Sequence, residues 1–80
     1  MSQKFSPGSY VVGLKQSIKM IQSRRAKKVY LASDADFHIL RQVSDICLSN
    51  EVCNDTSFTK SELGKMCKIE VGASVVTLLN

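Results

Sequence analysis

The stretch Tyr10-Val11-Val12-Gly13-Leu14-Lys15-Gln16-Ser17-Ile18-Lys19 passes from a short apolar run into a sequence with helical spacing. After the glycine, apolar side chains recur at i, i+4 and i+7, which predicts a helix that buries Leu14, Ile18 and Ile21 on one face. The run before the glycine is β-rich and predicts a short strand at Tyr10–Val12. The fold is therefore expected to begin with a strand that leads directly into a helix.

The predicted helix, which ends near Ser23, has an unusual charge at its start. Lys15 and Lys19 lie one turn apart on an exposed face, and no acid occurs within Met1–Arg25. Helix N-termini normally favour acids, because their unpaired N–H groups and the macrodipole carry partial positive charge. A lysine, open N–H groups and Gly13, which lets another backbone approach closely, together favour an anion site. The alternative is a solvated lysine face on a surface helix.

The composition predicts a single small domain with acidic partners. Eighty residues fit one domain over residues 1–80 with a small core, and residues 1–9 read as a loose tail. The formal net charge of +4 favours nucleic acid or an anionic membrane surface. No apolar run approaches the ~20 residues of a membrane span, so we expect a cytoplasmic protein. Six basic residues and no acid occur from Lys15 to Lys28, and the last four of them suit the negative end of the helix dipole: Arg24, Arg25, Lys27 and Lys28.

No pattern in the sequence is typical of a catalytic or metal site. The three cysteines lack Cys-x-x-Cys spacing, and we interpret them as small buried hydrophobes: Cys47, Cys53 and Cys67. Asp34 and Asp36 are the only close carboxylate pair, and both suit the cap of a following helix. His38 has no neighbouring Ser, Cys or acid in a triad-like arrangement, and the glycines are isolated from one another. We therefore expect no enzyme activity, no metal and no cofactor.

Strands and helices alternate through the rest of the chain. The pattern predicts a buried strand at Val29–Ala32, a helix to about Ser49, an edge strand within Val52–Thr56, a short helix after the capping box of Thr59 and Glu62, and a buried strand at Ala73–Leu79. The buried face of the second helix is predicted at Phe37, Leu40, Val43 and Cys47. This alternation predicts an α/β sandwich, with a mostly buried sheet and helices on both faces.

The loop Lys68–Gly72 places Ile69 and Val71 on either side of Glu70, just before the last strand. Apolar side chains in a tight loop usually pack into the core. The alternative is an exposed pair that packs on an unstacked base, as RNA-binding proteins do in loops and bulges. The residues by themselves leave both interpretations open.

Four motifs carry a resemblance to a known family: Val12–Lys19, Ala26–Val29 with Ala32–Asp36, Leu63–Lys65, and Ile69–Ala73. In this order and spacing they resemble the kink-turn-binding ribosomal proteins of the archaeal large subunit (the "seven-Ae" type), and most closely their small bacterial, YbxF-like relatives. The resemblance covers nearly the whole chain. It implies a three-layer α/β/α fold around a four-stranded mixed sheet. It also implies recognition of the kink-turn, a sharply bent RNA with tandem sheared G·A pairs and a flipped-out nucleotide.

The resemblance further implies two RNA-binding segments. The start of the first helix enters the major groove beside the G·A pairs, and corresponds here to Gly13, Lys15, Gln16 and Lys19. The loop before the last strand covers the flipped base, and corresponds here to Ile69, Glu70 and Val71. With Lys19, Lys27 is expected to neutralise phosphates.

One departure from the family pattern concerns the residues that read the RNA. The archaeal proteins have Asn and Glu where this chain has Lys15 and Gln16, and Gln is a weaker acceptor than Glu for guanine N–H groups. The bacterial relatives share the Lys-Gln pair. The implied partner is a structured RNA such as ribosomal RNA, with no DNA and no membrane, and we expect a monomer.

Two other functions are compatible with the same fold. Related families include stress-response and scaffold proteins, so a protein–protein interaction module is one alternative. It predicts a sizeable apolar surface patch and little salt dependence of binding. The other alternative is the RNA-binding subunit of an RNA-modifying enzyme, which needs a separate catalytic subunit. Fold alone does not decide among these functions.

Overall fold

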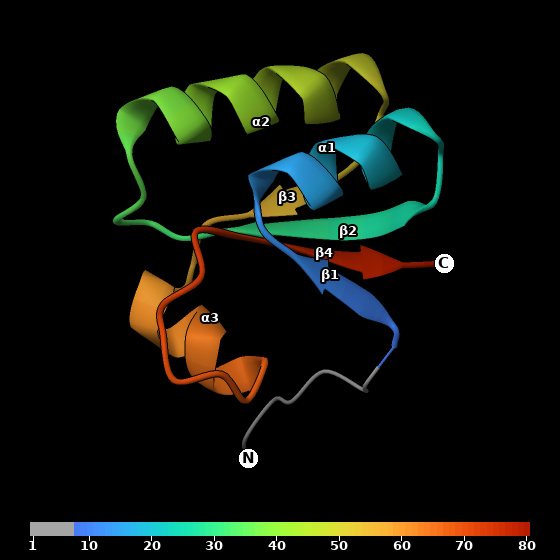
Figure 1. Ribbon diagram of the computed structural model, residues 1–80. Helices are drawn as coiled ribbons and strands as arrows, with labels where there is room; N and C mark the ends of the chain where they lie inside the picture. Colours follow the sequence, from blue (N-terminus) through green and yellow to red (C-terminus); the bar gives the residue numbers. More distant parts are fainter. Residues whose placement is uncertain (1–7) are drawn as a thin grey trace.

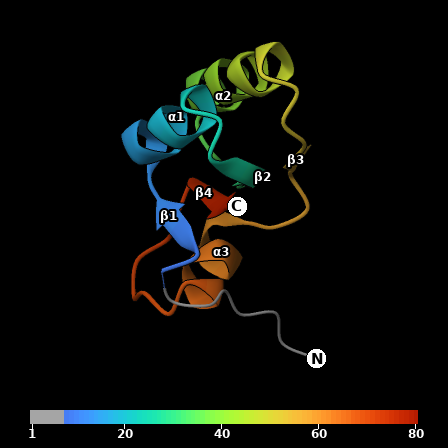
Figure 2. The same ribbon diagram turned by 90° about the vertical axis from the view of Figure 1, so that its right-hand side faces the viewer.

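The computed structural model describes residues 8–80, which form a four-stranded sheet between two layers of helices (Figure 1). In chain order the elements are β1 (Tyr10–Val12), α1 (Leu14–Gln22), β2 (Ala26–Leu31), α2 (Phe37–Ser49), β3 (Asn54–Asp55), α3 (Lys60–Met66) and β4 (Val75–Leu79). α1 and α2 cover one face of the sheet and α3 covers the other, as Figures 1 and 2 show. The predicted α/β/α sandwich is confirmed. The predicted loose tail falls mostly on residues 1–7, outside the described residues.

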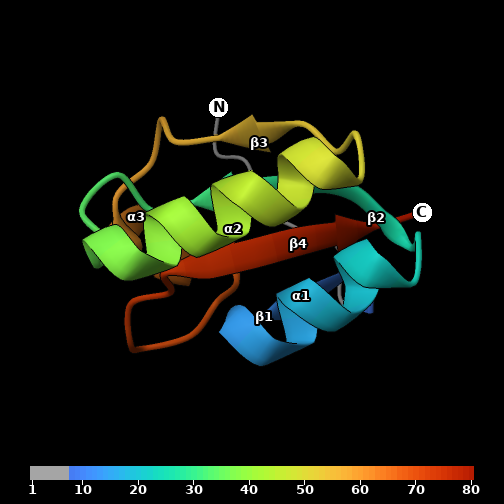
Figure 3. The same cartoon turned by 90° about the horizontal axis from the view of Figure 1, so that it is seen from above.

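The strands lie in the order β1-β4-β2-β3, which Figure 3 shows from above. β4 is antiparallel to β1 and β2, whereas β2 and β3 are parallel, so the sheet is mixed as expected. The edge strand expected within Val52–Thr56 is confirmed as β3. It is shorter than that range, because Asn and Asp are poor strand formers. β2 begins before the predicted Val29, so the assignment of Lys27 and Lys28 to the helix end is wrong, and both lie in a strand.

Two hydrophobic clusters fill the two faces of the sheet. The cluster beneath α1 and α2 contains Ile21, Val29, Leu31, Val43, Cys47 and Val75. The cluster on the α3 side contains Ala32, Ala35, Leu63, Met66, Cys67, Ala73 and Val76. Neighbouring residues of one strand, such as Val75 and Val76, belong to different clusters because strand side chains alternate between faces. This alternation explains why the predicted strands are apolar at consecutive positions.

The buried face of α1 differs from the predicted one. Ile21 is fully buried as predicted, but Leu14 and Ile18 are half-buried, and the fully buried residue between them is Ser17. Ser17 lies three residues after Leu14 and four before Ile21, so these positions share one side of the helix. α1 packs on β4, and a small side chain at this point allows the helix to approach the sheet closely. Helical spacing predicted the approximate position of the buried face of α1, but it did not predict which side chain lies at the centre of that face.

Phe37 was expected on the buried face of α2, and this prediction is wrong. Its side chain is 69% exposed, whereas Val43 and Cys47 on the same helix are fully buried. α2 begins beyond the end of β2, so its first turn has no strand opposite it (Figures 1 and 3). Periodicity defines a side of a helix but not how far the sheet extends beneath it.

The prediction that the cysteines are small buried hydrophobes is confirmed for two of the three. Cys47 and Cys67 are buried, and burial raises the pKa of both thiols, so they stay protonated at neutral pH. Cys53 is exposed, contrary to prediction, because it precedes the edge strand β3. Across residues 8–80, no helix combines the length and apolar character that crossing a membrane requires.

The three helices of residues 8–80 end in the same way. The residue after each C-cap has a left-handed backbone: φ is 61° at Arg24, 57° at Glu51 and 59° at Lys68. Glycine is the usual residue here because it has no Cβ, and an L-residue in this conformation costs about 1–2 kcal/mol. None of the three helices uses glycine. Each helix end therefore stores a small amount of backbone strain.

Candidate nucleic-acid interface

α1 is the one helix in the described part of the chain whose start carries no side-chain cap. Asp36 caps α2 by accepting a hydrogen bond from the backbone N–H of His38 at 2.9 Å. At α3, the predicted capping box of Thr59 and Glu62 is confirmed in both directions. The first backbone hydrogen bond of α1 runs from the Ser17 N–H to the Gly13 carbonyl, which leaves the earlier N–H groups of the first turn open. An uncapped helix start with no acid nearby is suited to an anion.

Gly13 is required by its conformation rather than by crowding. Its φ of 109° and ψ of 160° lie in a region that L-residues rarely adopt, and an added Cβ would meet no atom within 4 Å. The open space beside it therefore remains available to a ligand. Its N–H donates to the carbonyl of Val75 at 2.9 Å, which fixes the start of α1 to the start of β4.

The α3–β4 loop (residues 67–74) is held against α3 by close backbone contacts. An added Cβ on Gly64 would clash with the carbonyl oxygen of Val71, so only a glycine lets the loop lie here. Gly72 packs against Lys60, where an added Cβ would lie 3.1 Å from the Lys60 Cβ. The N–H of Ala73 donates to the Lys60 carbonyl at 3.1 Å. The loop is therefore fixed on both sides of Val71.

Of the two apolar residues in the loop, one packs into the core and the other is exposed, so each of the two interpretations applies to one residue. Ile69 is half-buried and packs on the hydrophobic cluster of α3. Val71 is 70% exposed, and Glu70 between them is also exposed. Ile69 therefore anchors the loop to the core, and Val71 is exposed to solvent.

A hollow of about 350 Å³ lies between this loop and α3, and it includes residues that the sequence did not suggest as site residues. It is lined by Asp34, Lys60, Ser61, Lys65, Ile69, Glu70, Val71 and Gly72. Asp34 was assigned to the cap of α2, but its carboxylate accepts from the Lys60 N–H at 2.8 Å and so holds the start of α3. Lys60 and Lys65 are exposed and bring two cations to the hollow. The one indication of Lys65 in the sequence is that it belongs to the Leu63–Lys65 motif, which contributes to the family resemblance.

The fold brings the start of α1 and the α3–β4 loop to the same end of the molecule (Figures 2 and 3). The link is the start of β4, since Val75 accepts from the Gly13 N–H and follows the loop directly. Lys15 and Gln16 are exposed at this end, and Lys19 lies one turn along α1. Lys27 is placed elsewhere: its neighbour Ala26 pairs with Leu79, at the opposite end of β4.

The exposed side of α1 forms a second, shallow hollow of about 440 Å³ between its two lysines. It is lined by Lys15, Ile18, Lys19, Gln22 and Ser23. Among residues 8–80, no group of three or more His, Cys, Asp and Glu side chains lies close enough to hold a metal ion. The chemistry that these surfaces offer is cationic side chains, open N–H groups and one exposed apolar side chain.

Comparison with known proteins identifies the family. Residues 2–80 match the ribosomal protein L7Ae/L30e/S12e/Gadd45 family. The chain is 35% identical over 68 residues to the RNA-binding protein TTE2299 of Caldanaerobacter subterraneus subsp. tengcongensis, a match that covers 85% of this chain and 83% of that protein. It is 36% identical over 72 residues to the RNA-binding protein YbxF of Geobacillus stearothermophilus, with 90% and 88% covered.

A solved structure with the same fold is the Giardia lamblia 15.5kD RNA binding protein, which superposes with a TM-score of 0.84 at 23% identity. The superposition covers 90% of this chain and 61% of that one. The resemblance drawn from the four sequence motifs is confirmed, and the chain belongs to the ribosomal protein L7Ae/L30e/S12e/Gadd45 family.

Proposed function

We propose that this protein is a non-catalytic RNA-binding protein that recognises kink-turn RNA and associates with the ribosome or another structured RNA. The observation that carries the proposal is the placement of an uncapped, cationic helix start beside a loop with an exposed Val71. Membership of the family and the names of its relatives, RNA-binding proteins, support the choice of RNA as the partner.

The start of α1 supplies the groups that read the G·A pairs. A duplex RNA major groove is too narrow for side chains, but a kink with sheared pairs opens base edges there. Lys15 donates to guanine O6 or N7, and Gln16 both donates and accepts. The open N–H groups beside Gly13 bind a phosphate, and Lys19 neutralises another. Base edges then give selectivity, and phosphates give affinity.

The α3–β4 loop covers the flipped-out nucleotide. Val71 provides an apolar surface for the base, and the neighbouring hollow has a volume within the range of about 300–1,000 Å³ that is typical of small-ligand sites. Lys60 and Lys65 on its rim suit the phosphates on either side of an extruded base. Because the loop is fixed by Gly64 and Gly72, we expect the protein to select the kinked form of a flexible RNA rather than to reshape itself.

The test is binding to a kink-turn RNA across a salt series, with a control RNA whose G·A pairs are replaced by Watson–Crick pairs. We expect a strong preference for the kinked RNA. The logarithm of the binding constant should fall linearly with the logarithm of the salt concentration, with a slope of about 0.7–0.9 per phosphate contact. Equal, salt-sensitive binding to both RNAs would leave only a basic surface, and binding to neither would favour a protein–protein module.

Val71→Ala is expected to weaken kink-turn binding about tenfold. The substitution removes two methyl groups that the bound base would cover, and each contributes about 0.8 kcal/mol to binding. Val71 is 70% exposed in the free protein, so the free energy of unfolding should change by less than about 0.5 kcal/mol. Titration with labelled RNA and thermal unfolding measure the two effects.

Leu48→Ala is the matched control for this variant, since Leu48 is 81% exposed at the far end of α2. It should alter neither binding nor stability. A fall in thermal stability of Val71→Ala as large as its fall in affinity would make Val71 a structural residue and would remove it from the site.

A protein–protein module receives less support from this surface. Among residues 8–80 the exposed large apolar side chains are Phe37, Leu48 and Val71. Phe37 and Leu48 lie at opposite ends of α2, so no single patch gathers all three. Large interaction patches are typically contiguous, and this arrangement is not.

A further inference from the structure

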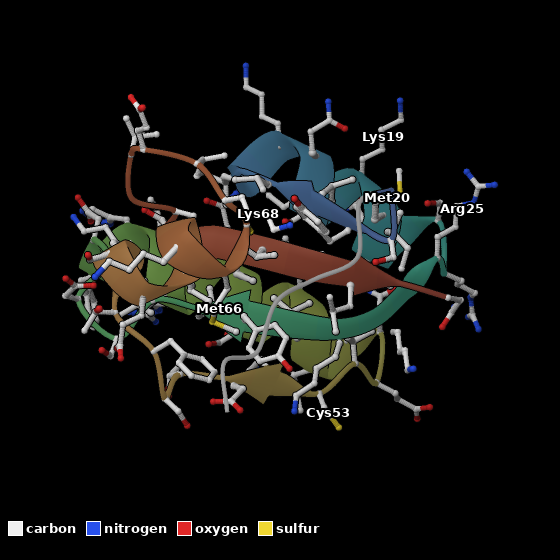
Figure 4. The ribbon with its side chains drawn as sticks, turned by 90° about the horizontal axis from the view of Figure 1, so that it is seen from below. Lys19, Met20, Arg25, Cys53, Met66 and Lys68 are labelled. Atoms are coloured by element: carbon white, nitrogen blue, oxygen red, sulfur yellow. The ribbon has the colours of Figure 1, made fainter. Side chains whose placement is uncertain are left out.

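A second group of cations lies at the opposite end of α1 from the proposed kink-turn site. Arg24, Arg25 and Lys27 are exposed in and just after the turn between α1 and β2. Figure 3 shows this turn at the end of the sheet where the chain finishes, away from the α3–β4 loop. Viewed from below, Lys19 lies toward the β1 edge of the sheet, Arg25 lies at the end where β4 finishes, and Cys53 lies at the opposite, β3 edge (Figure 4).

Within residues 8–80, neither Arg24 nor Arg25 forms an ion pair with a carboxylate. The ion pair that forms in this part of the chain joins Lys28 to Asp55, with the Lys28 Nζ and an Asp55 carboxylate oxygen 3.8 Å apart. Arg24 and Arg25 instead line a hollow of about 520 Å³ whose other walls are Gly8, Ser9, Leu79 and Asn80. Two exposed guanidinium groups without an ion pair, beside a hollow, form a surface that attracts anions.

Arg24 and Arg25 also occupy backbone positions that favour other residues. The Arg24 N–H donates to the Ile21 carbonyl at 3.2 Å, and the Arg25 N–H donates to the Met20 carbonyl at 2.9 Å. This pair of hydrogen bonds defines the Schellman motif, which favours glycine at the first position and an apolar residue at the second. Arg24 adopts the left-handed φ of 61° that the first position requires.

The other two helices show what the second position normally holds. At the end of α2, Glu51 is followed by Val52, and at the end of α3, Lys68 is followed by Ile69. The same two hydrogen bonds form at both ends. Val52 and Ile69 are half-buried and pack on the two hydrophobic clusters. Arg25 is exposed, so α1 is the one of these three helices that lacks the apolar contact of its motif. The helix dipole favours positive charge at this turn, but it does not require arginine in place of both the glycine and the apolar residue of the motif.

We infer that Arg24 and Arg25, together with Lys27, bind the phosphate backbone of an RNA duplex that flanks the kink. The inference rests on the proposed function, because it extends the same RNA along α1. Lys15, Lys19 and the neighbouring Ser23 line one continuous side of the helix, and Arg24 follows directly. The nine residues of α1 span about 14 Å, which corresponds to several successive phosphates of a duplex. Guanidinium groups bind phosphate oxygens in pairs and carry no sequence information.

The test compares Arg24→Gly and Arg25→Gln with the unchanged protein on two kink-turn RNAs, one with a long flanking stem and one with that stem cut short. On the long RNA we expect each variant to bind severalfold more weakly and to reduce the salt slope by about 1. On the short RNA both variants should bind like the unchanged protein. The preference for kinked over straight RNA should stay the same, because neither arginine reads a base.

Three further variants separate charge from strain. Arg24→Lys keeps the charge and should keep the salt slope. Arg41→Ala removes one positive charge from the exposed side of α2 and should leave the slope unchanged. Glu51→Gly relieves the same backbone strain at the end of α2, so it should raise the melting temperature as Arg24→Gly does, without weakening binding.

The inference would be overturned if the salt dependence of binding to the long RNA had the same slope for Arg24→Gly, Arg25→Gln and the unchanged protein. An equal loss in Arg41→Ala would also overturn it, because net charge alone would then explain the effect. Binding to vesicles that contain phosphatidylserine, lost in Arg24→Gly while RNA slopes stay constant, would assign the arginines to a lipid surface instead. Failure of the proposed function is a different result: the unchanged protein would not distinguish kinked from straight RNA, whatever the arginine variants do.

Discussion

The double variant Lys15→Ala, Gln16→Ala is expected to lose the preference for kinked RNA over its Watson–Crick control. Each good contact to a base edge gives about 1–3 kcal/mol of discrimination, so losing two should lower the affinity for the kink-turn at least 30-fold. Both side chains are exposed at the open end of α1. Alanine has a higher helix propensity than either residue, so thermal stability should be unchanged or slightly higher.

Lys19→Ala provides the matched control for the double variant. Lys19 lies one turn along the same exposed side of α1, and its proposed partner is a phosphate. It should weaken binding to both RNAs equally and reduce the salt slope by about 1. If the double variant behaved in the same way as Lys19→Ala, with its preference for kinked RNA intact, then Lys15 and Gln16 would contact only the backbone and the G·A pairs would be read elsewhere.

Gly64→Ala is expected to destabilise the protein and to weaken RNA binding together. In an ordinary helix interior this substitution stabilises by about 0.5–1 kcal/mol. Here the new Cβ would lie closer than 3.0 Å to the Val71 carbonyl oxygen, in the buried contact between α3 and the loop. Overpacking of this kind costs about 1–3 kcal/mol, and for a domain of this size each kcal/mol lowers the melting temperature by about 4–8 °C.

The loss of binding by Gly64→Ala follows from displacement of the loop that presents Val71. Gln42→Ala on the exposed side of α2, away from the loop and its hollow, is the control and should change neither property much. Hydrogen exchange of the backbone N–H groups of residues 69–73 reports the displacement directly, since the Ile69 and Ala73 N–H groups are bonded to α3 residues. A rise in melting temperature, as for an ordinary helical glycine, would show that the loop yields without cost and is not held rigidly by Gly64.

Local patterns were enough to predict the elements and their order. The apolar runs of β2 and β4, the helical spacing of α1 and α2, and the Thr59–Glu62 capping box each depend on residues within one or two turns of one another. These patterns predicted Leu14, Ile18 and Phe37 to be more buried than they are, and they did not single out the buried Ser17. Their burial depends on where the sheet lies beneath the helix, which is a property of the assembled fold.

The candidate site was predictable only in outline. Resemblance to a family identified the two segments, but the sequence did not show that Ile69 is an anchor and Val71 is exposed. It also gave no sign that Gly13 is required by its φ rather than by close approach. The contacts that shape the loop join Gly64 to Val71 and Lys60 to Gly72, and close contacts between a helix and the loop that follows it leave no periodic signal in the sequence.

The hydrogen bond from the Gly13 N–H to the Val75 carbonyl has a consequence for how binding fails on heating. Both proposed contact segments are attached to β4, which lies between β1 and β2 inside the sheet. Interior strands open only when the whole domain opens. The distance between the two segments is therefore maintained for as long as the domain stays folded. Heat should abolish both contacts in a single step rather than loosening one before the other.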